Sequence, residues 1–67
     1  MSPKFKTAIE EIIHEKTLWD RREIMILSCE AKGPLGYVVN AYIPSLDRKN
    51  QGQKFEIDIS EVLMYIN

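Results

Sequence analysis

The two side chains best suited to nucleophilic or acid–base chemistry are the only histidine, His14, and the only cysteine, Cys29. A histidine can act as a general base or a pH switch, and a cysteine becomes nucleophilic when its surroundings lower its pKa. His14 falls opposite Phe5 on a predicted helix, which favours an exposed surface histidine. Cys29 alternates with Met25 and Leu27 in an apolar run. This favours a buried thiol that packs as a small hydrophobic group.

The carboxylates form two close pairs, Glu10 with Glu11 and Glu56 with Asp58. A glycosidase needs two carboxyl groups on opposite sides of a cleft. Glu56 and Asp58 instead share one outward face of a predicted strand, about 7 Å apart by strand geometry. Both pairs therefore favour solvated surfaces over an acid–base site.

Motifs for phosphate binding, dinucleotide binding and hydrolysis are missing from the sequence. The three glycines, at positions 33, 36 and 52, match no Walker or dinucleotide pattern. One histidine without a nucleophile elbow does not make a Ser-His-acid triad. A structural zinc needs about four ligands, and only His14 and Cys29 are soft donors. We expect no enzyme, no metal and no cofactor.

A helix is predicted over residues 3–17. Ser2 can cap it, and Pro3 then occupies the first helical position, where a missing N–H is harmless. Apolar residues follow at helical spacing and form one stripe that would face a core. These are Phe5, Ala8, Ile9, Ile12 and Ile13.

After residue 22 the apolar period changes from about 3.6 to 2, which predicts strands. Their expected ranges are 23–31, 37–43, 54–59 and 62–66. The first is apolar on both faces, which predicts a central strand or one beneath the helix. For 62–66 a helical turn capped by Ser60 is the alternative, but valine, tyrosine and isoleucine favour a strand.

The sequence predicts an α+β fold, with the N-terminal helix packed on a three- to four-stranded antiparallel β-meander. The stretch "FEIDISEVLMYI" reads as a strand, a one-turn break and a short strand. This element order resembles that of small barrels of the Sm and SH3-like kind. The resemblance implies that the sheet curls into a closed barrel; the alternative is an open sheet.

Length and charge limit the classes of function. A chain of 67 residues is one small domain, and such chains bury only about 60% of their unfolded surface. Oligomerisation is one common source of added stability. The net charge is −1 with no basic cluster, which argues mildly against strong nucleic-acid binding. No apolar run is long enough for a membrane span or a secretory signal. We expect a cytoplasmic protein.

Three hypotheses for function remain. The first is a non-enzymatic regulatory or interaction module that self-associates as a homo-oligomer or docks on a larger protein. The second is a β-domain that binds single-stranded RNA or DNA through tyrosines and basic residues. The third is a small-ligand site at an oligomer interface. The candidate interaction residues are Trp19, Arg21, Arg22, Leu35, Tyr37, Tyr42, Arg48 and Lys49.

The loop "KGPLG" between the first two predicted strands holds the most specific of these candidates. Pro34 and Gly36 suit a type I turn, so a hairpin is expected. Its five residues exceed the minimum for a hairpin and expose Leu35 at the tip. Leu35 is therefore predicted to be either a solvent-exposed tip or a contact with a partner.

Overall fold

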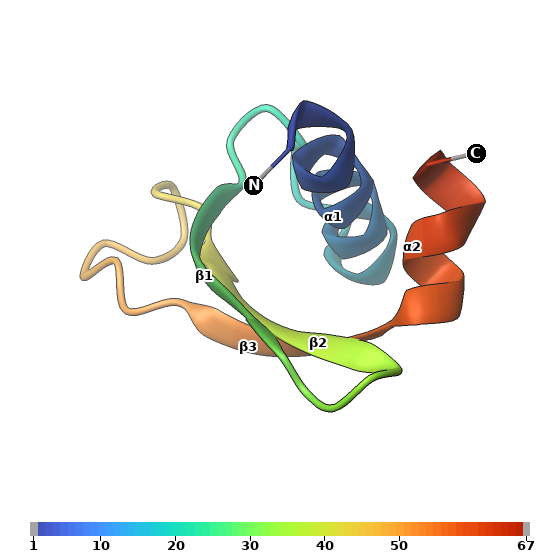
Figure 1. Ribbon diagram of the computed structural model, residues 1–67. Coiled ribbons are helices and arrows are strands. Elements are labelled where there is room, and N and C mark those ends of the chain that lie inside the picture. Colours follow the sequence, from blue (N-terminus) through green and yellow to red (C-terminus); the bar gives the residue numbers. More distant parts are fainter. Residues whose placement is uncertain (1, 67) are drawn as a thin grey trace.

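The computed structural model describes residues 2–66, which form two helices on one face of a three-stranded antiparallel sheet (Figure 1). The sheet is open, with strand order β1-β2-β3. In chain order the elements are α1 (Pro3–Thr17), β1 (Met25–Ala31), β2 (Gly36–Tyr42), β3 (Gln53–Asp58) and α2 (Ile59–Ile66).

Helix α1 begins as the capping pattern predicts. The Ser2 Oγ accepts a hydrogen bond of 3.2 Å from the backbone N–H of Phe5, and Pro3 fills the first turn. The helix ends at Leu18, which adopts a left-handed conformation with φ of 65° and donates its N–H to the His14 carbonyl. The buried stripe of α1 comprises Ala8, Ile9, Ile12 and Ile13.

The inner face of the sheet supplies the other half of the core. Strict alternation along β2 and β3 turns Val39, Ala41, Phe55 and Ile57 toward the helices, and all four are buried. Val62 of α2 joins them. Burial of these apolar side chains is the main source of stability in so small a chain.

Strand β1 is an edge strand, so the prediction of a central strand is wrong, although its inner side does face the helices. A bulge between Ile26 and Ser28 inserts one residue into its pairing with β2. Ile26 and Cys29 therefore both face inward, opposite the buried Ala41 and Val39, while Leu27 faces outward. The predicted grouping of Leu27 with Cys29 on one face is also wrong, because the bulge reverses the alternation.

The expected fourth strand at 62–66 is wrong, because these residues belong to α2. The Glu61 carboxylate accepts a hydrogen bond of 3.0 Å from the backbone N–H of Asp58. Asp58 and Glu61 stand at the N-cap and N3 positions, so this is half of a capping box. A closed Sm or SH3-like barrel is not formed either, since β1 and β3 stay at opposite edges of an open sheet.

Candidate interaction surface

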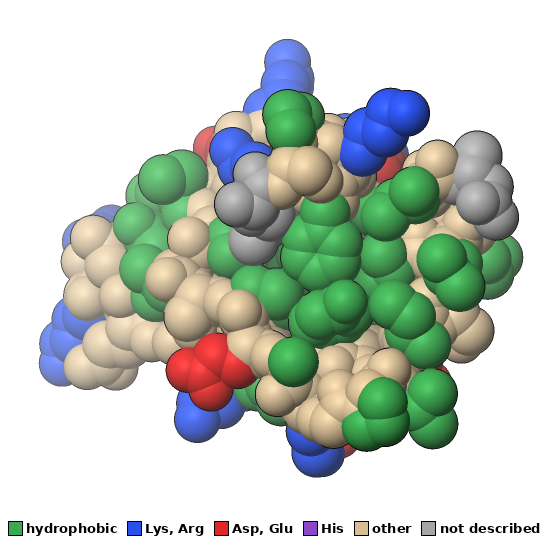
Figure 2. All heavy atoms as spheres, viewed as in Figure 1, with side chains coloured by type: hydrophobic (Ala, Val, Ile, Leu, Met, Phe, Trp, Pro, Cys, Tyr) green, Lys and Arg blue, Asp and Glu red, His purple; other side chains and the backbone are tan. Residues whose placement is uncertain are grey.

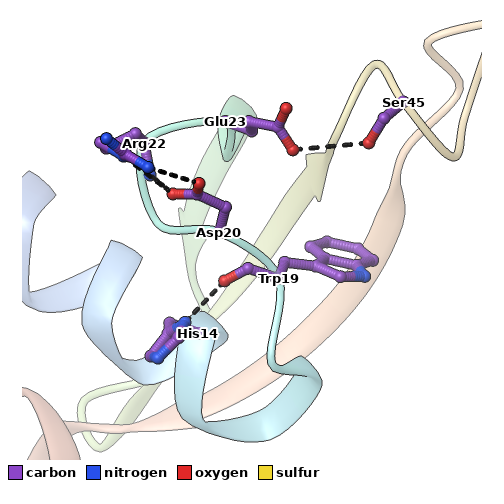
Figure 3. A network of polar contacts seen from close by, with 6 residues as sticks. All are labelled: His14, Trp19, Asp20, Arg22, Glu23 and Ser45. Atoms are coloured by element: carbon purple, nitrogen blue, oxygen red, sulfur yellow. Dashed lines mark hydrogen bonds and ion pairs between the residues drawn. The ribbon is translucent and has the colours of Figure 1, made fainter.

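Trp19 lies at the edge of the core, in the loop between α1 and β1. Its ring meets Phe55 edge-on, with 5.7 Å between centroids. Its carbonyl accepts a hydrogen bond of 2.6 Å from His14 Nδ1 (Figure 3). His14 is consequently half-buried and holds the loop, rather than standing free on the surface as predicted. Because the acceptor is a carbonyl, the proton of the neutral ring sits on Nδ1.

Arg21 and Arg22 both form ion pairs near their own loop. Arg21 Nε lies 2.7 Å from Glu11 Oε1 of α1. Arg22 contacts the Asp20 carboxylate with its guanidinium at 3.0 Å and with its backbone N–H at 2.9 Å (Figure 3). These hydrogen bonds hold the pKa of Asp20 below its ordinary value. The two arginines therefore order the loop.

Tyr37 and Tyr42 lie on opposite faces of β2, as the alternation predicts. Tyr37 faces inward and contacts Phe5 edge-on at 5.1 Å between centroids. Tyr42 faces outward beside Met25 of β1 and borders a shallow hollow that also contains Trp19. A stacking platform for single-stranded nucleic acid needs its aromatic rings on one surface. The structure does not place these two tyrosines on one surface.

Arg48 and Lys49 are exposed in the loop that joins β2 to β3. The loop is held from inside by Asp47, whose carboxylate accepts a hydrogen bond of 2.7 Å from the backbone N–H of Gly52. This bond lowers the pKa of Asp47. The two basic residues therefore project from an ordered loop.

Leu35 is the predicted candidate that lies beside a larger apolar surface. Its carbonyl accepts a hydrogen bond of 2.8 Å from the backbone N–H of Ile59, which ties the hairpin tip to the start of α2. Leu35 is 71% exposed, Leu63 49% and Met64 78%. We call Leu35, Leu63, Met64 and Tyr65 the α2 surface. A helix that is apolar on all sides normally has a second surface to pack against.

A groove between α1 and α2 borders this surface. Its charged wall contains an ion pair in which Lys16 Nζ lies 3.3 Å from Glu61 Oε1. A hydrogen bond with Glu15 raises the pKa of Tyr65. An apolar floor with fixed charges at its rim suits a peptide or protein segment better than a metabolite. The groove is lined by Ile12, Glu15, Lys16, Glu61, Met64 and Tyr65.

A second apolar hollow, the β1 groove, lies between the start of α1 and β1. In Figure 2 hydrophobic side chains gather across the middle of this face, between α1 and the β1–β2 hairpin. Cys29 lies there half-buried, and burial raises the pKa of its thiol. The groove is lined by Ser2, Phe5, Cys29, Ala31, Tyr37 and Ile66.

Leu63 and Met64 were not identified from the sequence as candidate interaction residues, because residues 62–66 were assigned to a strand instead of to α2. The signal was present, since "DISE" has an N-cap residue followed three positions later by glutamate. Had the helix been assigned, its uniformly apolar sequence "VLMYI" would have pointed to a partner surface.

Among residues 2–66, no three histidine, cysteine or acidic side chains are grouped as metal ligands. Within the same range, none of the helices has both the length and the apolar character needed to cross a membrane. In comparisons with known proteins, no protein-family model, no curated protein and no solved structure matches this chain.

Proposed function

We propose that this chain is a non-enzymatic interaction module that binds another protein chain through the α2 surface. The observation that carries the proposal is the composition of α2. Val62 is buried against the fold, while Leu63 and Met64 project into solvent from the other side of the same short helix. Covering these side chains would release apolar surface from water, which is the main driving force of association.

The surroundings of α2 support a protein partner over a small molecule. Leu35 is an exposed apolar residue whose carbonyl is bonded to the start of α2, and the groove beside α1 adds Lys16 and Glu61 at its rim. A protein interface typically combines an apolar centre with a polar rim. Methionine is also enriched at such interfaces because its flexible side chain adapts to different contours.

The test compares two substitutions of exposed apolar residues by glutamate. Met64→Glu alters the α2 surface, and Leu46→Glu is the control, because Leu46 is 71% exposed in the β2–β3 loop. Both variants should keep the wild-type circular dichroism spectrum. We expect Met64→Glu to weaken binding to the partner, measured by light scattering for self-association and by crosslinking in the source cells for other proteins. The Leu46→Glu variant should bind as the wild type does.

Two outcomes would contradict this function. The first is a wild-type chain that stays monomeric and yields no crosslinked protein. The second is equal binding by the wild type and Met64→Glu, which would exclude the α2 surface as the contact.

A further inference from the structure

The two edges of the sheet differ in how well their side chains protect them from pairing with another strand. The outward residues of β3 are Lys54, Glu56 and Asp58, a charge at every second position. The outward side of β1 carries Met25 and Leu27, each 49% exposed. Natural sheets discourage edge pairing with charged residues, especially lysine, and with proline. By this criterion the side chains of β3 protect its edge, whereas residues 25–27 of β1 carry neither a charge nor a proline. The bulge between Ile26 and Ser28 is the protective feature that this edge does have.

The inner side of β1 is also incompletely covered. Cys29 and Ile26 are half-buried and Ala31 is exposed, although all three face the helices. The β1 groove lies against them. A strand added beside β1 would therefore gain main-chain hydrogen bonds and place its inward side chains next to this groove, as in β-strand addition.

We propose that β1 pairs in antiparallel orientation with β1 of a second copy, so that the two sheets form one continuous sheet. This contact lies on a different part of the molecule from the α2 surface, and it goes beyond the proposed function by assigning a second surface with a defined partner. In the part of the chain described, β1 has β2 on one side and no strand on the other.

The bulge selects the register of this pairing. Because it reverses the alternation, Met25 and Leu27 face outward in the first half of β1, and Ser28 and Glu30 do so in the second half. Paired strands must place residues of the same facing opposite one another. The rule is satisfied along the strand when Leu27 lies opposite Ser28 of the second copy. In that register the inward-facing Ile26 lies opposite the inward-facing Cys29 of the second copy. If the register is shifted by one or two residues, at least one inward-facing residue lies opposite an outward-facing residue of the second copy.

The same register aligns opposite charges at both ends of the seam, the contact between β1 of one copy and β1 of the second. Glu23 precedes β1 by two residues and Lys32 follows it by one, and both are exposed. In the selected register Glu23 lies opposite Lys32 of the second copy, and two-fold symmetry repeats the pair. To form it, Lys32 must leave its exposed ion pair with Glu56 of its own chain, a type of contact that contributes little to stability. Opposite charges directly across strands are favourable, and like charges are unfavourable. This complementarity, together with the facing rule, identifies a second copy as the partner.

The experiment follows the monomer–dimer equilibrium of the full chain by analytical ultracentrifugation between about 1 µM and 1 mM, which spans weak to moderate affinities. We expect Leu27→Lys to raise the dimer dissociation constant at least about tenfold, because lysine opposes edge pairing. Leu46→Lys should leave it unchanged. Both positions are exposed, and circular dichroism checks that each variant is folded.

A charge exchange tests the register itself. Glu23→Lys places two lysines opposite each other and should raise the dissociation constant about threefold to tenfold. Adding Lys32→Glu in the same chain should restore it to within about threefold of the wild type. Failure of the second substitution to restore affinity would overturn the register. Hydrogen exchange of the wild type should show concentration-dependent protection of residues 25–31.

The outcomes separate this inference from the proposed function. If Leu27→Lys weakens the dimer and Met64→Glu does not, β1 is the seam. If Met64→Glu abolishes the dimer and Leu27→Lys has no effect, the β1 proposal is wrong while the α2 surface is supported. A wild type that stays monomeric throughout the range overturns the β1 proposal and leaves the α2 surface to the crosslinking test.

Discussion

Gly52 illustrates how one residue can fix the conformation of a loop. Its φ is 82°, and a Cβ atom there would overlap Asn40 Oδ1 and lie 2.9 Å from Leu27 Cδ1. We expect Gly52→Ala to lower the free energy of unfolding by about 2 kcal/mol or more, because strain and overlap add. Urea denaturation measures the change.

Gly33 provides the matched control for this prediction. Its φ of 71° is also left-handed, but a Cβ would meet nothing within 4 Å. Gly33→Ala should therefore cost only the backbone strain, about 1 kcal/mol. Equal costs at the two glycines would show that contact with Asn40 does not contribute.

Cys29 is predicted to react slowly with alkylating reagents. The thiolate is the reactive form, and burial raises the pKa of this thiol, so the thiolate fraction at pH 7 is smaller than for a free cysteine. The rate of iodoacetamide labelling should rise with pH and stay below that of an exposed thiol. Ser45→Cys in a Cys29→Ser background provides that exposed reference. Labelling of Cys29 as fast as the reference would contradict its shielding.

At the scale of the element, α2 depends on its cap. Glu61→Ala removes both the acceptor for the Asp58 N–H and the ion pair with Lys16. Glu61→Gln removes the charge but keeps an acceptor oxygen. We expect the alanine variant to lose about 1 kcal/mol of stability and the glutamine variant less. Thermal unfolding followed at 222 nm measures both; equal losses would assign the effect to the ion pair.

The elements that were predicted correctly from the sequence are those in which the local sequence signals agree with one another. Ser2 and Pro3 mark the start of α1 and its apolar stripe marks the buried side, while alternation sets the facing of β2 and β3. In the residues after Asp58, two local signals conflict. β-branched and aromatic residues favour a strand, but the cap formed by Asp58 and Glu61 and the packing of Val62 favour a helix. Packing and capping outweigh propensity here.

The position of β1 could not be read from its composition. An apolar strand is expected to be covered on both faces, and the bulge that exposes Leu27 leaves no mark in the sequence. The interaction surface was equally hidden, since Leu35 joins α2 only through its bond to Ile59, 24 residues later in the chain. Ion pairs such as Arg21 with Glu11 likewise depend on how the loop turns back toward α1.

For the molecule as a whole, the carboxylates predict how stability depends on acid. The folded pKa of Asp47 lies below its ordinary value of 3.8 because of the Gly52 N–H, and that of Glu56 lies below 4.5 because of a hydrogen bond from Lys32. A lowered folded pKa stabilises the folded state above the unfolded pKa, and this stabilisation is lost as the pH falls through the folded value. Stability should therefore be constant near neutral pH and fall below about pH 4.5.

Matched variants identify the groups responsible for this loss. Asp47→Asn removes the carboxylate that holds the β2–β3 loop, and Glu56→Gln removes the partner of Lys32 on the outward face of the sheet. Each variant should melt at a lower temperature than the wild type at pH 7, and the difference should shrink as the pH falls and the wild-type carboxyls become protonated. Melting temperatures between pH 7 and pH 2 test this. A constant difference across the range would show that these carboxylates do not contribute through their charge, and the acid sensitivity would then have to come from other carboxyl groups such as Asp20.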